Sequence, residues 1–148
     1  AREWLETPNM DRMAREGSHC AEAFVTTSLC SPSRATILTG LYTHQHTIVD
    51  NQASNPGIHT YFPKHLQDAG YKTAFFGKWH LGHHPKFLPT NHGFDEFYGL
   101  PYSNDMWPGH PESPKAWPVL PWYTIRAGDA LPSIETIDDL DDQDRITR

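Results

Sequence analysis

Residues 60–82 read TYFPKHLQDAGYKTAFFGKWHLG, and this stretch carries the main indication of the fold. Residues 60–69 predict a helix that ends at Gly70, and residues 71–76 predict a short strand that ends at Gly77. The side chains expected to be buried are Phe62, Leu66 and Ala69 on the helix and Ala74, Phe75 and Phe76 on the strand. A helix, a strand and then a polar cluster are typical of an α/β protein whose site lies at the carboxyl end of a strand.

The sequence near the N-terminus predicts another helix, from Pro8 to Arg15, that ends at Gly17. Proline suits the first position of a helix and glycine suits its exit. Met10, Met13 and Ala14 have the i, i+3, i+4 spacing of one helix face. We expect this apolar face to be part of the core.

Residues 30–34 read CSPSR and open a further predicted helix, which runs from Pro32 to Thr39 with Ser31 as its cap. This arrangement places the small side chain of Cys30 beside free backbone N–H groups and the positive end of the helix dipole, which favour an anion. Arg34, one turn into the helix, can add a fork of donors to a tetrahedral oxyanion. The residues alone leave a second interpretation open, in which Cys30 is a buried structural cysteine beside an ordinary helix start.

Residues 77–82 read GKWHLG and follow the predicted strand. If the chain stays extended there, Lys78 and His80 point the same way and Trp79 points into the core. Lys78 would supply a fixed positive charge, and His80 could donate a proton to a leaving alkoxide. A solvated turn that carries an unrelated lysine and histidine is the alternative.

The composition limits the classes of function. The chain has 148 residues, enough for one domain, and its mean hydropathy is −0.64. The formal net charge of −6 argues against nucleic-acid binding, and no apolar run is long enough to span a bilayer. Cys20 and Cys30 indicate no disulfide framework. The ten histidines complete no recognisable zinc ligand set, and the acidic run at residues 138–144 lacks the spacing of an EF-hand loop.

The pattern of residues divides the chain into three parts. Residues 1–82 form the α/β part that carries both polar clusters. Residues 83–132 are rich in proline and aromatic residues, and we expect an ordered excursion over the edge of the sheet. Residues 133–148 indicate the start of a helical segment that is cut short. The chain begins without methionine and stops just after the acidic run, so we expect it to be a fragment.

Taken together, these residues resemble the sulfatase family. Residues 30–40, CSPSRATILTG, look like the family's C-x-P-S-R…T-G motif, and residues 77–82 look like its second motif. Residues 7–14, TPNMDRMA, resemble the helix that precedes the first motif. Residues 92–99, HGFDEFYG, and residues 101–103, PYS, resemble the segment after the second motif in the arylsulfatase A-like branch. The resemblance therefore runs from about residue 7 to residue 105.

The resemblance implies a role for five residues. Cys30 would be oxidised by a separate formylglycine-generating enzyme to formylglycine, whose hydrate is the nucleophile and a ligand of the family's calcium ion. Arg34 would support that hydrate, and His80 would stand near the leaving or attacking oxygen. Lys78 and Ser103 would bind oxygens of the sulfate.

The resemblance also implies a fold, a substrate and a location. The fold would be alkaline-phosphatase-like, with a mostly parallel sheet flanked by helices that is incomplete in this chain. The family's other calcium ligands are aspartates on a strand before Ala1 and an Asp-Asn pair after Arg148. We therefore expect an N-terminal part of the catalytic domain that is inactive by itself. The substrate would be a sulfated small molecule or glycan, and the location periplasmic, secreted or lysosomal.

Two other functions compete with sulfate ester hydrolysis. A phosphatase or phosphodiesterase of the same superfold would be expected to use Ser or Thr as its nucleophile and a two-metal site, and Cys30 within C-x-P-x-R argues against it. A sulfatase-like module that binds anions without catalysis is the other alternative. The presence of Cys30, Arg34, Lys78 and His80 together favours the enzyme.

Overall fold

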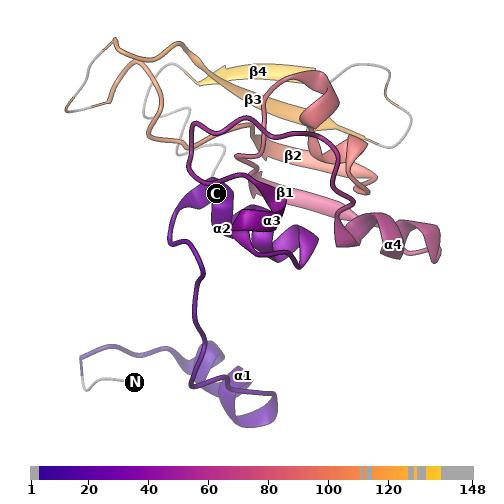
Figure 1. The fold of residues 1–148 in the computed structure, drawn as a ribbon. Helices are drawn as coiled ribbons and strands as arrows, with labels where there is room; N and C mark the ends of the chain where they lie inside the picture. The colour runs from indigo at the N-terminus through magenta and orange to yellow at the C-terminus, as the bar shows by residue number, and fades with distance from the viewer. Residues whose placement is uncertain (1–3, 111, 113–114, 127–128, 130–132, 138–148) are drawn as a thin grey trace.

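The computed structural model describes residues 4–110, 112, 115–126, 129 and 133–137, and within them it contains a four-stranded sheet (Figure 1). The strands are β1 (Ala74–Lys78), β2 (Glu96–Leu100), β3 (Leu120–Ile125) and β4 (Ser133–Ile137), in the spatial order β1-β2-β3-β4. β1 and β2 pair in parallel, whereas β3 runs antiparallel to both β2 and β4. The described sheet is therefore mixed, and its parallel part is the β1–β2 pair.

The helices in the described part of the chain are α1 (Pro8–Glu16), α2 (Cys30–Thr39), α3 (Thr43–His46) and α4 (Phe62–Asp68), with short 3-10 turns η1 (Pro85–Phe87) and η2 (Pro89–Asn91). α2 packs against α3 and α4, and these helices lie at the β1 side of the sheet (Figure 1). Gly40 ends α2 in the left-handed conformation, with a φ of 71°, as the sequence predicts. Among the described residues, no helix has the length and hydropathy needed to cross a membrane.

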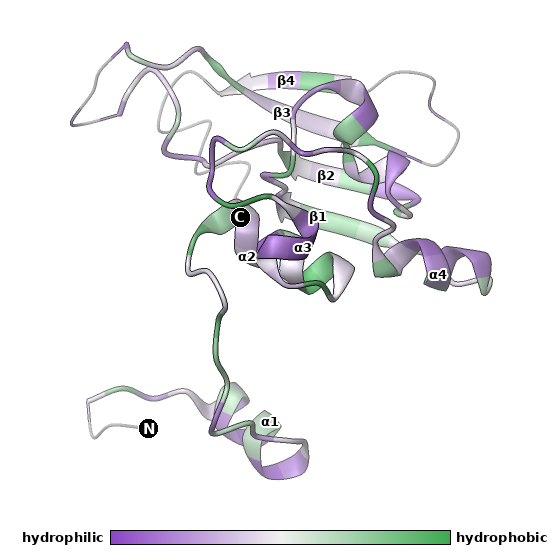
Figure 2. Cartoon of the chain, viewed as in Figure 1, coloured by the Kyte–Doolittle hydropathy of each residue, from purple (hydrophilic) through white to green (hydrophobic). Residues whose placement is uncertain are grey.

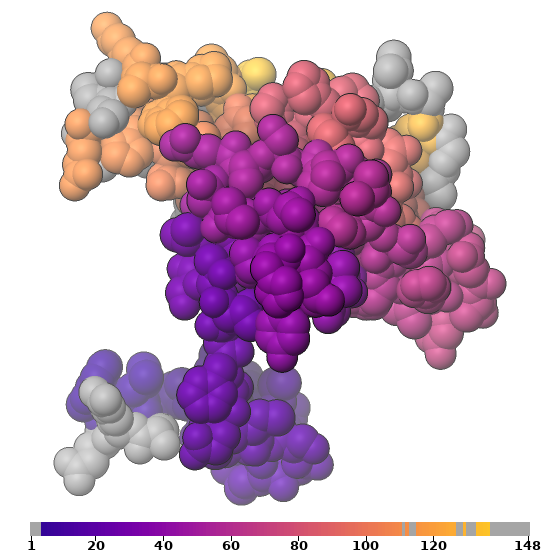
Figure 3. All heavy atoms as spheres, viewed as in Figure 1, coloured from indigo at the N-terminus to yellow at the C-terminus, as the bar shows by residue number. Residues whose placement is uncertain are grey.

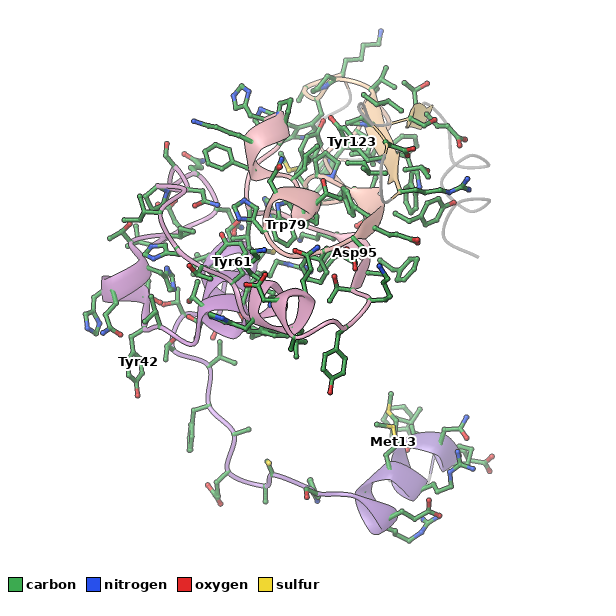
Figure 4. All side chains as sticks on the ribbon, turned by 90° about the vertical axis from the view of Figure 1, so that its right-hand side faces the viewer. Met13, Tyr42, Tyr61, Trp79, Asp95 and Tyr123 are labelled. Atoms are coloured by element: carbon green, nitrogen blue, oxygen red, sulfur yellow. The ribbon has the colours of Figure 1, made fainter. Side chains whose placement is uncertain are left out.

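The main core lies between these helices and the β1–β2 pair. Trp79 and Phe97 are fully buried, and Tyr61 is nearly so. The ring centroid of Trp79 lies 6.0 Å from that of Tyr61 and 5.2 Å from that of Phe75. Figure 4 shows Tyr61 and Trp79 inside this layer, whereas Tyr42 points outward. The burial of Trp79 confirms the prediction made from residues 77–82.

The predicted burial of β1 and α4 is partly wrong. Burial in β1 follows the two-residue period of a strand, so Phe75 faces the core while Ala74 and Phe76 are exposed. α4 is shorter than predicted and buries Pro63, which follows the buried Tyr61 at the N-cap. The predicted inward-facing residues of this helix, which are Phe62, Leu66 and Ala69, are exposed. The segment is a helix as predicted, but its first turn, rather than its whole apolar stripe, contacts the core.

α1 has the predicted position but not the predicted burial. It ends just before Gly17, yet it contains no buried residue, and Met10 and Met13 are 70% and 72% exposed. The helix stands apart from the sheet at the end of a long connecting segment, and Figure 3 shows the same separation on the surface. Figure 2 shows hydrophobic residues along that connection, where Phe24 and Val25 are exposed. The apolar face of α1 is therefore not part of the described core.

The boundaries predicted after residue 82 are also corrected. Residues 83–132 do not form an excursion over the sheet edge, because they contain β2 and β3, two strands of the sheet itself. Residues 133–137 form β4 rather than the start of a helix, and they pair with β3. Residues 138–148, including the acidic run, lie outside the described residues.

Candidate active site

The first turn of α2 holds Cys30. The preceding residue, Leu29, is extended and acts as the N-cap, and its carbonyl accepts a hydrogen bond from the Ser33 N–H at 3.0 Å. Ser31, which the sequence predicts as the cap, is instead a buried residue of this turn. Its N–H donates to Asn51 Oδ1 at 3.0 Å, so a side chain from the loop after α3 satisfies a free donor of the helix start. Cys30 is half-buried beside this hydrogen bond between Ser31 and Asn51.

Lys78 donates hydrogen bonds to both Cys30 and Ser103. Its ammonium group donates to Cys30 Sγ at 3.0 Å and to Ser103 Oγ at 3.2 Å. Lys78 is the last residue of β1, and Ser103 follows the end of β2. The carboxyl ends of these two parallel strands meet at one edge of the sheet, and α2 brings its N-terminus to the same place. The structure therefore brings together three of the residues predicted from separate parts of the sequence.

Arg34 contacts the backbone of β1. Its Nη1 donates a hydrogen bond to the carbonyl oxygen of Lys78, which ties α2 to the end of the strand. The predicted fork of donors directed at an oxyanion is therefore at least partly used to hold Lys78 in place. The positive charge of Arg34 also lowers the pKa of the Cys30 thiol.

The surroundings of Cys30 favour a negative charge. The hydrogen bond from Lys78 lowers the pKa of the Cys30 thiol below its ordinary value, and the charges of Lys78 and Arg34 and a hydrogen bond with Asn51 act in the same direction. Burial opposes this shift, but the pKa remains lowered overall. A site that stabilises a thiolate in this way can also hold an anionic ligand.

His80 lies at the edge of the same cluster. Its φ of 57° is left-handed, so the chain does not stay extended after Trp79, and the condition on which Lys78 and His80 were predicted to point the same way does not hold. The His80 N–H donates to the Pro101 carbonyl at 3.0 Å, which continues the contact between β1 and β2.

The electrostatic surroundings keep His80 neutral near pH 7. Burial, followed by the positive charges of Lys78 and Arg34, lowers the pKa of His80 to about 4, although Asp105 acts in the opposite direction. His80 Nδ1 is buried and has no hydrogen-bond partner among the described residues. Such an atom is available to a ligand that enters the cluster.

Two residues of the cluster were missed by the sequence reasoning. Asn51 holds the start of α2, and Asp105 accepts a hydrogen bond from Ser103 that is the main reason for its lowered pKa. Asn51 lies in a polar run, DNQASN at residues 50–55, that has the composition of an ordinary loop. Asp105 lies two residues after the predicted Ser103, and this proximity is the only signal that could have found it.

The described residues do not form a calcium site. They contain no group of three His, Cys, Asp or Glu side chains placed to hold a metal ion. Asp95 is used in the fold, where its carboxylate accepts hydrogen bonds from the Thr73 N–H at 2.9 Å and from Gln67 Nε2 at 2.9 Å. Asp50 accepts bonds from the N–H groups of the two loop residues Gln52 and Ala53. A calcium ion needs six to eight oxygen ligands, and the cluster around Cys30 does not provide them.

The protein-family model described as Sulfatase matches residues 2–145. This chain belongs to the sulfatase family. Its similarity to characterised sulfatases is clear in sequence: it is 44% identical over 109 residues to arylsulfatase G of Rattus norvegicus, a match that covers 70% of this chain and 21% of that protein. It is 40% identical over 131 residues to N-acetylgalactosamine-6-sulfatase of Mus musculus, covering 80% of this chain and 24% of the relative. The chain thus spans between a fifth and a quarter of the length of these sulfatases.

Solved structures of sulfatases share the fold. The structure of BT4656 in complex with its substrate D-glucosamine-2-N,6-O-disulfate is 33% identical, with a TM-score of 0.64 over 90% of this chain and 24% of that chain. PsFucS1 sulfatase from Pseudoalteromonas sp. is 27% identical, with a TM-score of 0.76 over 95% of this chain and 32% of that chain. The fold is therefore the alkaline-phosphatase-like fold of sulfatases, of which this chain contains a mixed sheet flanked by helices.

Proposed function

We propose that the protein containing this chain hydrolyses sulfate esters, with residue 30 as the nucleophile after conversion of Cys30 to formylglycine. The observation that carries the proposal is the position of the Lys78 ammonium group, which contacts both Cys30 Sγ and Ser103 Oγ. A fixed positive charge between a nucleophile and a hydroxyl donor suits a tetrahedral sulfate group. The family membership supports the same reaction.

Formylglycine hydrate would supply two hydroxyl groups on one carbon, one to attack sulfur and a second whose deprotonation expels sulfate and restores the aldehyde. The other residues of the cluster would hold the substrate for this attack. Lys78 would donate to a sulfate oxygen, and Ser103 would do so by turning its single O–H from Asp105 to the substrate. Arg34 would keep Lys78 at its position through the Lys78 carbonyl. Asn51 would keep the first turn of α2 in place, so that residue 30 has a fixed orientation.

His80 would transfer a proton to the oxygen of the leaving alcohol. A neutral imidazole is a poor acid, so His80 must first take up a proton. In the free site, burial and the charges of Lys78 and Arg34 lower the pKa of His80 to about 4. A bound sulfate ester carries a negative charge that offsets these two positive charges. Substrate binding would therefore raise the pKa of His80 and favour the protonated form when it is needed.

Two requirements of the proposal concern groups outside the described residues. Conversion of Cys30 would need a formylglycine-generating enzyme, and Pro32 and Arg34 at the second and fourth positions after Cys30 support recognition by it. For calcium, residue 30 as formylglycine would be the ligand that this chain contributes. The remaining ligands of the ion are not among the described residues, which contain no group of three His, Cys, Asp or Glu side chains placed to hold a metal.

A sulfated sugar is the substrate class that the relatives support. BT4656 has D-glucosamine-2-N,6-O-disulfate as its substrate, and Ps i-CgsB, 33% identical over 70% of this chain, was solved in complex with k-i-k-neocarrahexaose. A periplasmic, secreted or lysosomal location stays a prediction from the family.

Turnover of paired chromogenic esters tests the reaction. The intact protein, produced together with a formylglycine-generating enzyme, should hydrolyse 4-nitrophenyl sulfate in preference to 4-nitrophenyl phosphate, and Cys30→Ala should abolish this activity. Preference for the phosphate would indicate a phosphatase of the same superfold. Binding of sulfate esters without any turnover would indicate an anion-binding module. Either result would contradict the proposal.

A further inference from the structure

A cavity of about 580 Å³ adjoins the candidate active site. Ser31, Asn51 and His80 contribute to its wall, so it meets the candidate site at His80 and at the residue after Cys30. Cys30 itself lines a separate cavity. The segment after His80, including His83, His84 and Lys86, also lines the cavity. Its volume lies within the range of pockets that hold small-molecule ligands.

The charge of this cavity has one sign. Among the described residues that line it, Lys86 is positively charged, three are histidines, and none is Asp or Glu. The negative charge of Asp105 raises the pKa of His80, but Asp105 does not line the cavity. Side-chain amides from the 51–55 loop line it as well. A wall that carries a lysine and no carboxylate favours an anionic ligand.

The wall that carries Lys86 is held by specific contacts. Phe87 anchors it, because the Phe87 carbonyl accepts a hydrogen bond from the buried Trp79 Nε1 at 2.8 Å. Gly82 packs so closely on Phe87 that an added Cβ would lie 2.6 Å from Phe87 Cβ. The Lys86 ammonium group lies 4.6 Å from the centroid of the Phe87 ring. Lys86 is therefore presented from a segment whose position is determined by the core, which lowers the cost of ordering it around a ligand.

We infer that the alcohol part of the substrate occupies this cavity and carries a second anionic group, which Lys86 binds. The inference rests on the proposed sulfate ester hydrolysis, because that reaction fixes which end of the substrate faces residue 30. With the reacting sulfate at Lys78 and Ser103 and the leaving oxygen at His80, the rest of the alcohol extends past His80 into the cavity. A sulfated sugar with a second sulfate or a carboxylate has the required size and charge.

The affinities of matched sugars that differ in one sulfate group test whether Lys86 binds a second anionic group. In the intact protein carrying Cys30→Ala, which prevents turnover, calorimetry would compare monosulfated glucosamine and galactosamine with their disulfated counterparts. The disulfated sugar of at least one pair should bind about tenfold more tightly, a difference of about 1.4 kcal/mol. Lys86→Ala should reduce this preference to about twofold or less, and Lys86→Arg should retain most of it. Lys64→Ala, which removes an exposed lysine of α4 that pairs with Asp68, should leave it unchanged.

The outcomes separate the inference from the proposed function. The inference is wrong if no pair shows a preference for the disulfated sugar, or if Lys86→Ala retains that preference. In a parallel assay, the unmutated protein should hydrolyse 4-nitrophenyl sulfate, which has no second anionic group. Turnover of that ester without any preference among the sugars would overturn only the subsite. A preference that depends on Lys86, in a protein that hydrolyses no sulfate ester, would support the anionic subsite and overturn the proposed reaction.

Discussion

Lys78 makes the contacts on which the candidate site depends. Lys78→Ala removes the donor shared by Cys30 and Ser103, so it should reduce kcat/KM for a sulfate ester by an amount equivalent to about 2 to 4 kcal/mol, as for the loss of one oxyanion donor. Steady-state kinetics with 4-nitrophenyl sulfate measures the loss. Lys64→Ala is the matched control and should retain parental kinetics. A Lys78→Ala protein as active as the parent would remove Lys78 from the mechanism.

The same lysine should control the reactivity of the unconverted cysteine. In protein made without the modifying enzyme, the lowered pKa of Cys30 should make it react with iodoacetamide at neutral pH more rapidly than an ordinary thiol does. Lys78→Ala removes the largest cause of that shift, so the pKa of Cys30 should rise and its alkylation should slow several-fold. Labelling of the exposed Cys20, followed by mass spectrometry in the same samples, provides the internal reference. Equal rates at Cys30 in both proteins would contradict the described contact.

The sequence motifs predicted which residues belong to the candidate site, but not which contacts those residues make. Cys30, Lys78 and Ser103 were predicted because each belongs to a short motif, and the structure brings them together. Asn51 was missed because its role depends on a contact across 20 residues of sequence, which no local pattern encodes. The contact of Arg34 with the Lys78 carbonyl was missed for the same reason, since it spans 44 residues.

The pairing of β1 with β2 is the element that places Lys78 beside Ser103. Gly99 of β2 lies opposite Gly77, and a Cβ added at Gly99 would lie 2.0 Å from the Gly77 carbonyl oxygen. Gly99→Ala should therefore push the strands apart, destabilise the protein by about 3 kcal/mol and reduce activity. Gly70→Ala is the control, because a Cβ there meets no atom within 4 Å and the cost is the left-handed φ of 88°, about 1 kcal/mol.

Denaturant titration and turnover of both glycine variants make the comparison. Gly99→Ala should lose more stability and more activity than Gly70→Ala. Equal effects would mean that the close approach of the two strands does not determine the geometry of the site.

Local sequence patterns predicted the positions of several helices and of one strand but not how these elements pack. The approximate positions of α1, α2, α4 and β1 were predicted from caps, glycines and periodicity. The buried faces of these elements were not all predicted correctly. Periodicity identifies an apolar face but not whether another element covers it, as the exposed Met10 and Met13 of α1 show. β2 and β3 were read as an excursion because prolines surround them. Burial alternates at the start of β2 as in a strand, but in the sequence this appears only as the step from the polar Glu96 to the apolar Phe97.

Across the molecule, buried histidines should make stability depend on pH. Burial lowers the pKa of His46, His80 and His92 below the ordinary value of 6.5, to about 4 for His80. Above pH 6.5 these residues are neutral in both the folded and unfolded states. As the pH falls below 6.5, the unfolded chain takes up protons that the folded protein does not, so stability decreases toward the folded pKa values. Thermal unfolding of the intact protein from pH about 7.5 to about 5 measures this decrease.

A variant identifies the contribution of one histidine. The His92 ring centroid lies 4.7 Å from that of Tyr61, and His92 Nε2 has no partner among the described residues. His92→Phe should keep the ring packing and weaken the pH dependence of the melting temperature. His44→Gln on the surface should not change it. A pH dependence identical in the parent and in His92→Phe would show that His92 does not contribute to it.

Fragmentation mass spectrometry of the active, intact protein tests whether residue 30 is formylglycine when the protein acts on sulfate esters. Trypsin should release residues 16–34 as one peptide that contains both cysteines, so fragmentation must assign the modified position. Residue 30 should carry an aldehyde in place of the thiol, and Cys20 should keep its thiol. An unmodified thiol at residue 30 in fully active protein would contradict it.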